Sequence, residues 1–120
     1  MQTIQSRHPL VILGDAPEMD FRQIATYNNG TIGIFRSGPG ESPWEYHPDE
    51  DEILYVLDGS VTITVLTQTD SIDVPVEKGA LLVIPRGHWH RHTVHELLVE
   101  LYVSPENTQH SMAEDPRIAE

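Results

Sequence analysis

Residues 40–59 read GESPWEYHPDEDEILYVLDG, and residues 79–90 read GALLVIPRGHWH. Each segment places imidazole and carboxylate side chains beside a run of residues that is typical of a β-strand. A divalent metal inside a barrel needs such an arrangement, because its ligands must come from neighbouring strands and converge on one point. The functional prediction therefore depends on whether these two segments meet in space.

The composition indicates a globular chain. It has 120 residues, of which 38% are hydrophobic, and this length suits one domain spanning residues 1–120. No apolar stretch reaches the length needed to span a membrane, and a net charge of −12 disfavours binding to nucleic acid or anionic lipid. The chain contains no cysteine, which excludes disulfides and thiolate ligands and agrees with a cytoplasmic location. We therefore expect a cytoplasmic protein whose partners are small molecules.

The apolar residues recur mostly with a period of two, as they do in β-strands. Residues 61–66, for example, alternate apolar side chains with threonine. Turn signals such as Asn28–Gly30 and Asp58–Gly59 separate these runs and predict hairpins. The predicted strands cover residues 21–27, 31–36, 53–57, 61–66, 80–84 and 97–103. Many short strands with regular turns predict an all-β sandwich or closed barrel.

The two ends of the chain show weaker patterns. The barrel core is expected over about residues 20–104. Residues 1–9 carry no clear periodicity, and the polar tail from Ser104 onward is expected to be a surface arm with one helical turn near residues 111–114. Arms of this kind either fray or dock on a partner subunit.

Four side chains of the quoted segments are candidate metal ligands: Glu45, His47, Glu52 and His90. Glu45 and His47 are two residues apart, so on a strand they face the same side. Glu52 opens the next strand after an acidic loop, and His90 opens a strand after a Pro-Arg-Gly turn. If these strands are neighbours in a barrel, two imidazoles and two carboxylates converge.

This set predicts a particular kind of metal chemistry. His47, Glu52 and His90 form a two-histidine, one-carboxylate group, the type that holds non-haem iron(II) with open positions. Glu45 is either a fourth ligand or a base beside the metal. Two carboxylates cancel the charge of a divalent cation and favour iron, manganese or nickel over copper, while zinc also fits. The alternative is a hydrogen-bonded polar cluster in an empty pocket.

The two segments resemble the paired motifs of the cupin superfamily. Motif one is matched by Gly40, Glu45, His47, Glu52 and Gly59, and motif two by Gly79, Pro85, Gly87 and His90. The resemblance runs from about Thr31 to Val103, and the surrounding strings are similar to those of small single-domain bacterial cupins. The chain departs from the family in three places: a glutamate replaces the first histidine of motif one, that motif is one residue short, and Val94 replaces the closing asparagine of motif two.

The resemblance implies a double-stranded β-helix, the jelly-roll barrel of cupins, and a homodimer that covers strand edges. It also implies a metal-dependent enzyme that acts on a small organic molecule by oxygenase, isomerase or lyase chemistry. A non-enzymatic cupin that binds a small ligand is the alternative. A third reading is a barrel that has lost its metal and serves only in protein association.

Two further histidines flank His90 in the sequence. Because side chains alternate between the two faces of a strand, His88 and His92 are expected on the same side as His90. Either side chain would line the pocket there. We take His92, together with Glu45, as a candidate catalytic residue, because an imidazole near its neutral-pH titration can orient a substrate or shuttle protons. His88 instead faces water if it belongs to the turn, and His95 is expected in a turn.

For the remaining candidate residues, we expect a structural role by default. Trp44 and Trp89 have the opposite parity to the proposed ligands and are expected to point away from the pocket. Glu100 lies among aliphatic residues, so it either faces solvent or pairs with a histidine or arginine. Arg36 and Arg86 form surface salt bridges unless they clamp a substrate carboxylate.

Overall fold

The computed structural model describes residues 4–118 as one short helix and nine strands joined in a single antiparallel sheet. The elements are α1 (Pro9–Leu13), β1 (Asp20–Tyr27), β2 (Gly30–Ser37), β3 (Gly40–Glu41), β4 (Trp44–Tyr46), β5 (Glu52–Leu66), β6 (Ser71–Glu77), β7 (Leu81–Ile84), β8 (His90–Pro105) and β9 (Gln109–Ser111). The all-β fold class predicted from the period of two is confirmed. Among these described residues, no helix combines the length and apolar character needed to cross a bilayer.

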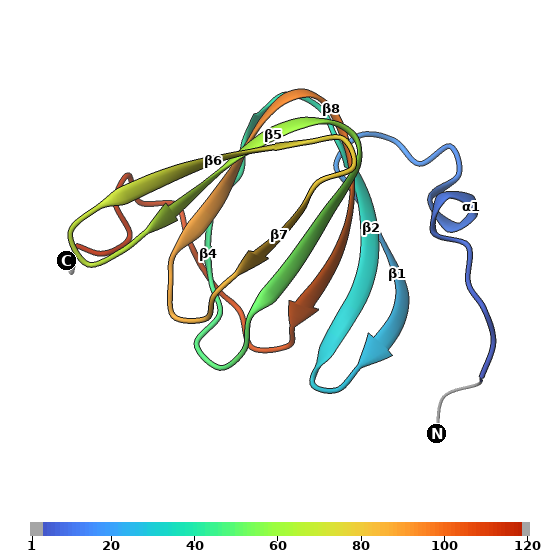
Figure 1. The fold of residues 1–120 in the computed structure, drawn as a ribbon, viewed down its shortest axis with the longest axis horizontal. Coiled ribbons are helices and arrows are strands. Elements are labelled where there is room, and N and C mark those ends of the chain that lie inside the picture. The colour runs from blue at the N-terminus through green and yellow to red at the C-terminus, as the bar shows by residue number, and fades with distance from the viewer. Residues whose placement is uncertain (1–3, 119–120) are drawn as a thin grey trace.

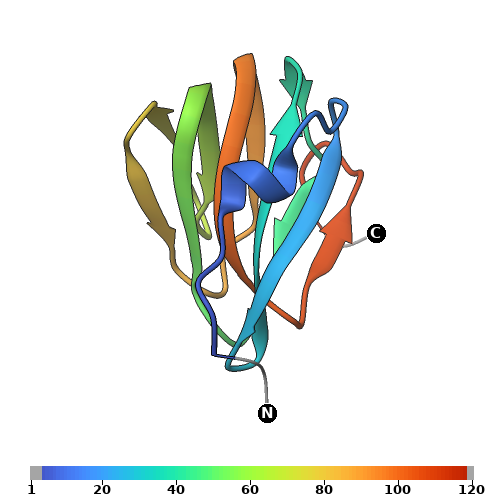
Figure 2. The same cartoon turned by 90° about the vertical axis from the view of Figure 1, so that its right-hand side faces the viewer.

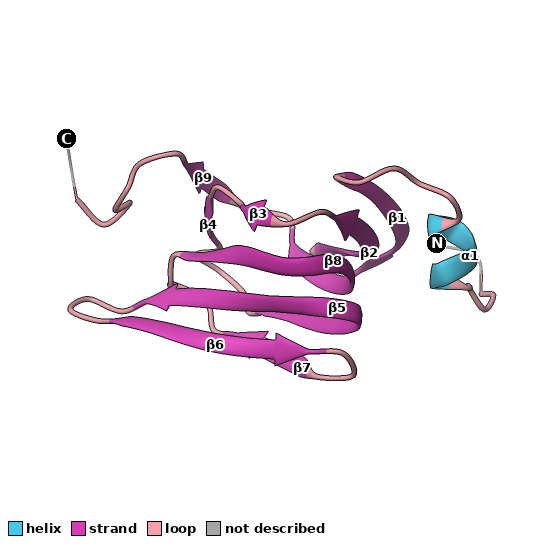
Figure 3. Cartoon of the chain, turned by 90° about the horizontal axis from the view of Figure 1, so that it is seen from above, coloured by secondary structure: helices cyan, strands magenta, loops and turns pink. Residues whose placement is uncertain are grey.

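Two long strands organise the sheet. β5 and β8 pair with each other along most of their length. On its other edge β8 pairs with β2, β3 and β4 in turn, while β5 pairs with β6 and β7. Figure 1 shows the sheet curling around an interior, and Figure 3 shows β3, β4 and β9 on one side with β8, β5 and β6 on the other. This curvature brings strands that are distant in the sequence to face one another.

The predicted hairpin at Asp58–Gly59 is wrong, because both residues lie inside the continuous strand β5. The pairing of β5 with β8 is irregular between Val56 and Val61, so the strand bends there instead of reversing. Gly59 has a φ of 84°, and a Cβ at this position would collide with the backbone carbonyl of Leu97. The glycine therefore marks a bend with close backbone contact, which the same dipeptide signal cannot distinguish from a turn.

Two other elements differ from the prediction. β6 was not predicted; within the described sheet it pairs only with β5, and its edge position tolerates Pro75. In the tail, residues 109–111 form β9 against β4, and the predicted helical turn near residues 111–114 is absent from the described structure. The hairpin at Asn28–Gly30 is confirmed, with Asn28 at a φ of 51° between β1 and β2.

The core has two parts. The larger one fills the interior and is built around buried residues of β5 and β8, such as Leu54, Ile63 and Leu98. The smaller one lies on the outer face, where Leu13 of α1 packs with Ile34 and Val99. Figure 2 shows α1 lying across that outer face. The helix therefore covers the outside of the sheet, and the interior holds the larger core together with the buried polar side chains.

Candidate metal centre

The two segments quoted at the start of the sequence meet in space. Gly87 donates its backbone N–H to the carbonyl oxygen of His47 at 2.8 Å. The backbone N–H of Arg86 donates to the Asp51 carboxylate at 2.9 Å, and its guanidinium donates to the carbonyl of Asp49 at 3.0 Å. These contacts fasten the turn before β8 to the loop between β4 and β5. The predicted convergence of the two segments is confirmed.

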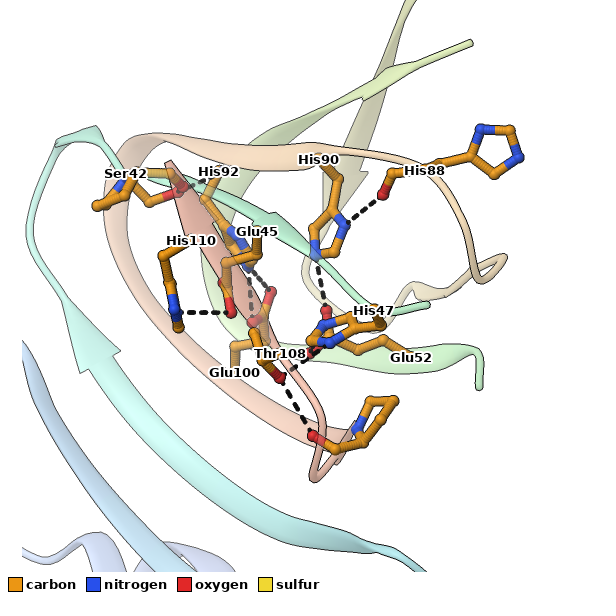
Figure 4. A network of polar contacts seen from close by, with 12 residues as sticks. Ser42, Glu45, His47, Glu52, His88, His90, His92, Glu100, Thr108 and His110 are labelled. Carbon is orange, nitrogen blue, oxygen red and sulfur yellow. Dashed lines mark hydrogen bonds and ion pairs between the residues drawn. The ribbon is translucent and has the colours of Figure 1, made fainter. Parts of the chain in front are cut away.

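Three of the four predicted ligands form one buried cluster (Figure 4). The imidazole Nε2 of His90 lies 3.1 Å from Glu52 Oε1, and that of His47 lies 3.5 Å from Glu52 Oε2. The potential ligand atoms of the three residues all lie within 4.8 Å of one another. Donors bound about 2.1 Å from one cation are separated by roughly 3.0–3.4 Å, so these spacings suit a shared metal ion.

The ring of His90 is oriented by backbone. Its Nδ1–H donates to the carbonyl oxygen of His88 at 3.3 Å, and its Nε2 faces the carboxylate of Glu52. A carbonyl and a carboxylate both accept hydrogen bonds, so both ring nitrogens of His90 face acceptors. With its proton on Nδ1, the ring directs the Nε2 lone pair toward Glu52, where a cation can bind.

Thr108 orients the second imidazole. Its hydroxyl donates to the carbonyl of Pro105 at 3.2 Å, which leaves the oxygen free to accept from His47 Nδ1–H at 3.0 Å. That tautomer turns the lone pair of Nε2 toward Glu52. This Nε2 is buried and has no hydrogen-bond partner among the described residues. A buried polar atom without a partner is costly, and a cation bound to Nε2 would remove that cost. Thr108 lies in the polar tail outside any motif, so the sequence carried no signal for it.

The ionisation of the cluster also suits a cation. Burial alone would raise the pKa of Glu52, but the neighbouring imidazoles of His47 and His90 hold it well below its ordinary range. Burial alone would lower the pKa of His47, but the carboxylate of Glu52, 3.5 Å from its Nε2, raises it. The site therefore carries a fixed negative charge and attracts positive charge, as either protons or a metal ion.

A cavity of about 330 Å³ opens beside this cluster and reaches the side chain of Glu52. His92 and Glu100 lie in its wall, with 8% and 0% of their surface exposed. The Nε2–H of His92 donates to the two carboxylate oxygens of Glu100 at 2.9 and 3.2 Å. Burial alone would lower the pKa of His92, but the charge of Glu100 and this hydrogen bond raise it to about 9. The alternative that Glu100 pairs with a histidine is therefore confirmed.

Glu45 occupies a different position from the other predicted ligands. It lines the cavity, and its backbone is in register with that of His90, but it does not belong to the cluster of three. Its carboxylate is partly exposed and lies 3.6 Å from the Nε2 of His110 (Figure 4). Its role as a fourth ligand or as a base stays a prediction.

The other predicted side chains lie outside the described cavity lining. Trp44 is buried beneath the guanidinium of Arg91, whose central carbon lies 4.3 Å from the ring centroid. Trp89 packs against Tyr46, and the ring of His88 contacts the carbonyl of Leu66, pointing away from His90 in Figure 4.

Two further residues differ from their predicted surroundings. The guanidinium of Arg36 donates to the carbonyls of Ala16 and Gly14, so it fastens the segment after α1 to β2. His95 was expected in a turn, but it lies within β8 with its Nε2 2.7 Å from the hydroxyl of Thr62. Arg36 and Arg86 therefore hold backbone segments in place.

Comparison with known proteins gives one family and several partial relatives. Residues 33–104 match the model of the Cupin domain. The chain is 43% identical over 47 residues to an acireductone dioxygenase of Sulfurihydrogenibium sp. (strain YO3AOP1), covering 38% of this chain and 26% of that protein. It is 36% identical over 64 residues to the tetracenomycin polyketide synthase protein TcmJ of Streptomyces glaucescens, covering 52% of this chain and 40% of that protein. The chain therefore spans well under half the length of these relatives.

A solved structure extends the likeness to the fold. A cupin-2 domain containing protein from Shewanella frigidimarina NCIMB 400 superposes with a TM-score of 0.60 at 26% identity, over 74% of this chain and 82% of that one. The predicted barrel architecture agrees with this match.

Proposed function

From the premise that this chain belongs to the cupin family, we propose that it is a metal-dependent enzyme acting on a small organic molecule. One observation carries the proposal: His47, Glu52 and His90 form a buried donor set with an unpartnered Nε2, and the carboxylate of that set faces a cavity. A substrate binds to a metal through open coordination positions, and these positions must face a cavity that can hold the substrate.

The donor set favours iron, manganese or nickel, and zinc also fits. A divalent cation bound there would act as a Lewis acid and offer open positions for substrate, dioxygen or water. The protein itself would supply the orientation of the three ligands through Thr108 and the carbonyl of His88.

Two residues of the cavity wall are proposed to be catalytic. Glu45 is a partly exposed carboxylate and would accept a proton from a substrate hydroxyl or carbon acid. His92 would hold a proton in the cavity through its contact with Glu100. Because both side chains line the same cavity as Glu52, each is within the space that a bound ligand would occupy.

Among oxygenase, isomerase and lyase chemistry, we place oxygenases first. The support is the 47-residue similarity to an acireductone dioxygenase. The similarity to the tetracenomycin polyketide synthase protein TcmJ supports an organic substrate. Both relatives are much longer than the matched segments, so the reaction itself is part of the proposal.

A cupin that binds a small ligand without turnover is the second candidate. The observation in its favour is Glu45, which replaces a histidine of the family motif and lies outside the cluster of three. Without Glu45 as a ligand or base, the site would hold a metal through three protein donors and bind a small molecule at the remaining positions.

Elemental analysis of protein purified without chelator, followed by oxygen-uptake measurements with phenols, enols and sugars, tests the proposal. We expect near-stoichiometric iron, manganese, nickel or zinc, and substrate-dependent oxygen uptake that Glu52→Gln abolishes. Glu50→Gln is the matched control, because it removes a carboxylate from the neighbouring loop and should leave both intact. Bound metal without turnover would favour the ligand-binding module, and a protein that ignores all four metals would overturn both candidates.

The homodimer also stays a proposal. Its support is an apolar row on the outer face of β5 and β7, where the exposed Ile53 is paired with the exposed Val83, and the half-buried Tyr55 with the exposed Leu81. Burying such a row against a second copy would remove apolar surface from water. Light scattering of the purified protein should give about twice the mass of one chain.

A further inference from the structure

The walls of the cavity carry an uneven set of charges. Four of the described lining residues are glutamates, one is a histidine, and none is a lysine or arginine. The glutamates are Glu41, Glu45, Glu52 and Glu100. The histidine, His92, already donates its Nε2–H to Glu100. The described walls therefore contain no free cationic group to pair with an anion.

The carboxylates differ in how their charge is compensated. Glu41 lies at the exposed rim, 3.3 Å from the guanidinium of Arg91. Among the described residues, the ion-pair contact of Glu45 is with the exposed imidazole of His110, at 3.6 Å. An ionised carboxylate accepts hydrogen bonds and donates none, so Glu45 prefers a ligand group that donates. An anionic group beside it would be repelled and would lose its hydration without gaining a partner.

Part of the cavity lining is aromatic. The rings of Phe21 and Phe35 stack with centroids 4.8 Å apart, and Tyr102 lies 6.3 and 6.0 Å from them. Aromatic faces attract both other rings and cations. A cavity of about 150 Å³ is enough to hold benzene. The volume of about 330 Å³ therefore accommodates a substituted single ring.

We infer that this cavity selects a ring-sized organic molecule whose groups facing the walls are neutral or cationic, such as a hydroxyl or an amine, and rejects molecules that present a carboxylate, sulfonate or phosphate to them. The inference deepens the proposed function, because it specifies the substrate class of the same cavity. The restriction on the charge of the substrate comes from the carboxylate of Glu45 and from the neighbouring glutamates of the cavity wall.

The test is binding of three matched probes, benzylamine, benzyl alcohol and benzoate, to metal-free ¹⁵N-labelled protein near neutral pH, followed by NMR. Because no metal takes part, its outcome is separable from the failure of metal binding, which is measured independently. We expect shifts at the amides of the lining residues Gly38 and Gly40, and binding of benzylamine tighter than that of benzoate by about tenfold.

Glu45→Gln should reduce the ratio of benzylamine to benzoate affinity by about threefold. Glu77→Gln removes one charge from the exposed part of β6 and should leave the ratio unchanged. Benzoate binding as tightly as benzylamine, an equal response of the two variants, or no binding of any probe at millimolar concentration would each overturn the inference.

Discussion

Two buried histidine–glutamate groups lie beside one another inside the sheet: the cluster of His47, Glu52 and His90, and the pair of His92 and Glu100. In the pair, one imidazole N–H meets both oxygens of one carboxylate. In the cluster, two imidazoles share one carboxylate, and the Nε2 of His47 has no hydrogen-bond partner within residues 4–118.

The two groups contain the same residue types, and they differ in the hydrogen-bond partners that surround them. Thr108 and the carbonyl of His88 accept from the Nδ1–H groups of the cluster and thereby turn both Nε2 atoms inward. In the pair, both carboxylate oxygens of Glu100 accept from the imidazole of His92, so neither buried oxygen lacks a partner. The cluster is therefore a candidate metal site, whereas the pair is closed on itself.

The largest effect is expected from breaking the pair. Glu100→Ala leaves the imidazole of His92 buried without its partner and should lower the free energy of unfolding by about 3–5 kcal/mol in urea denaturation. The exposed ion pair of Asp20 and Arg22 is the control, since Asp20→Ala should cost less than about 1 kcal/mol. Equal losses in the two variants would contradict the comparison.

Removing a member of the cluster should act on metal affinity. His90→Ala should weaken metal binding by more than about 100-fold in chelator competition. Loss of a residue that only orients a ligand typically costs about 10- to 100-fold in metal affinity, and loss of a ligand itself should cost more. His92→Gln, two residues along β8, is the matched control and should keep its affinity. If His92→Gln loses the metal as well, the two groups act as one site.

Thr108 provides a finer test of orientation. Thr108→Val keeps the shape of the side chain but cannot accept from His47, so metal affinity should fall by about 10- to 100-fold. Thr108→Ser keeps the hydroxyl and should restore most of the affinity. Both measurements use chelator competition, and an unchanged affinity in the valine variant would exclude a role for the hydroxyl.

The pair should also appear in the pH dependence of stability. The pKa of His92 is raised to about 9 in the folded protein, so its contribution is fully present below the ordinary value of about 6.5 and is lost as the pH rises toward 9. The metal-free protein should therefore lose about 1–2 kcal/mol of unfolding free energy over this range, measured by urea denaturation at several pH values. Metal binding should change in the opposite direction and strengthen with pH, because protons on His47 compete with the cation.

The smallest effect is expected at Glu45. Glu45→Gln removes a negative charge near the cluster and should weaken metal binding by about threefold to tenfold in chelator competition. A loss as large as that of His90→Ala would place Glu45 among the metal ligands. No change at all would leave it as a residue of the cavity wall.

Much of the site was predictable because it lies in local patterns. The spacing of His47, Glu52 and His90 against strand-like runs indicated convergence, and the structure brings these three together. The bend of β5 at Asp58–Gly59 was not predictable, because a glycine at positive φ serves a turn and a bent strand equally well. Whether the chain reverses there depends on Leu97, which is distant in the sequence and packs against Gly59.

By itself, the sequence determined the all-β class, the family motifs and the four candidate donors, since each is recognised from local patterns within short segments. Tertiary structure alone decided that Thr108 orients His47, that Glu100 closes on His92 and that Glu45 faces His110. Hydrogen bonds and ion pairs depend on distances of a few ångströms between side chains, and only the curvature of the sheet sets those distances.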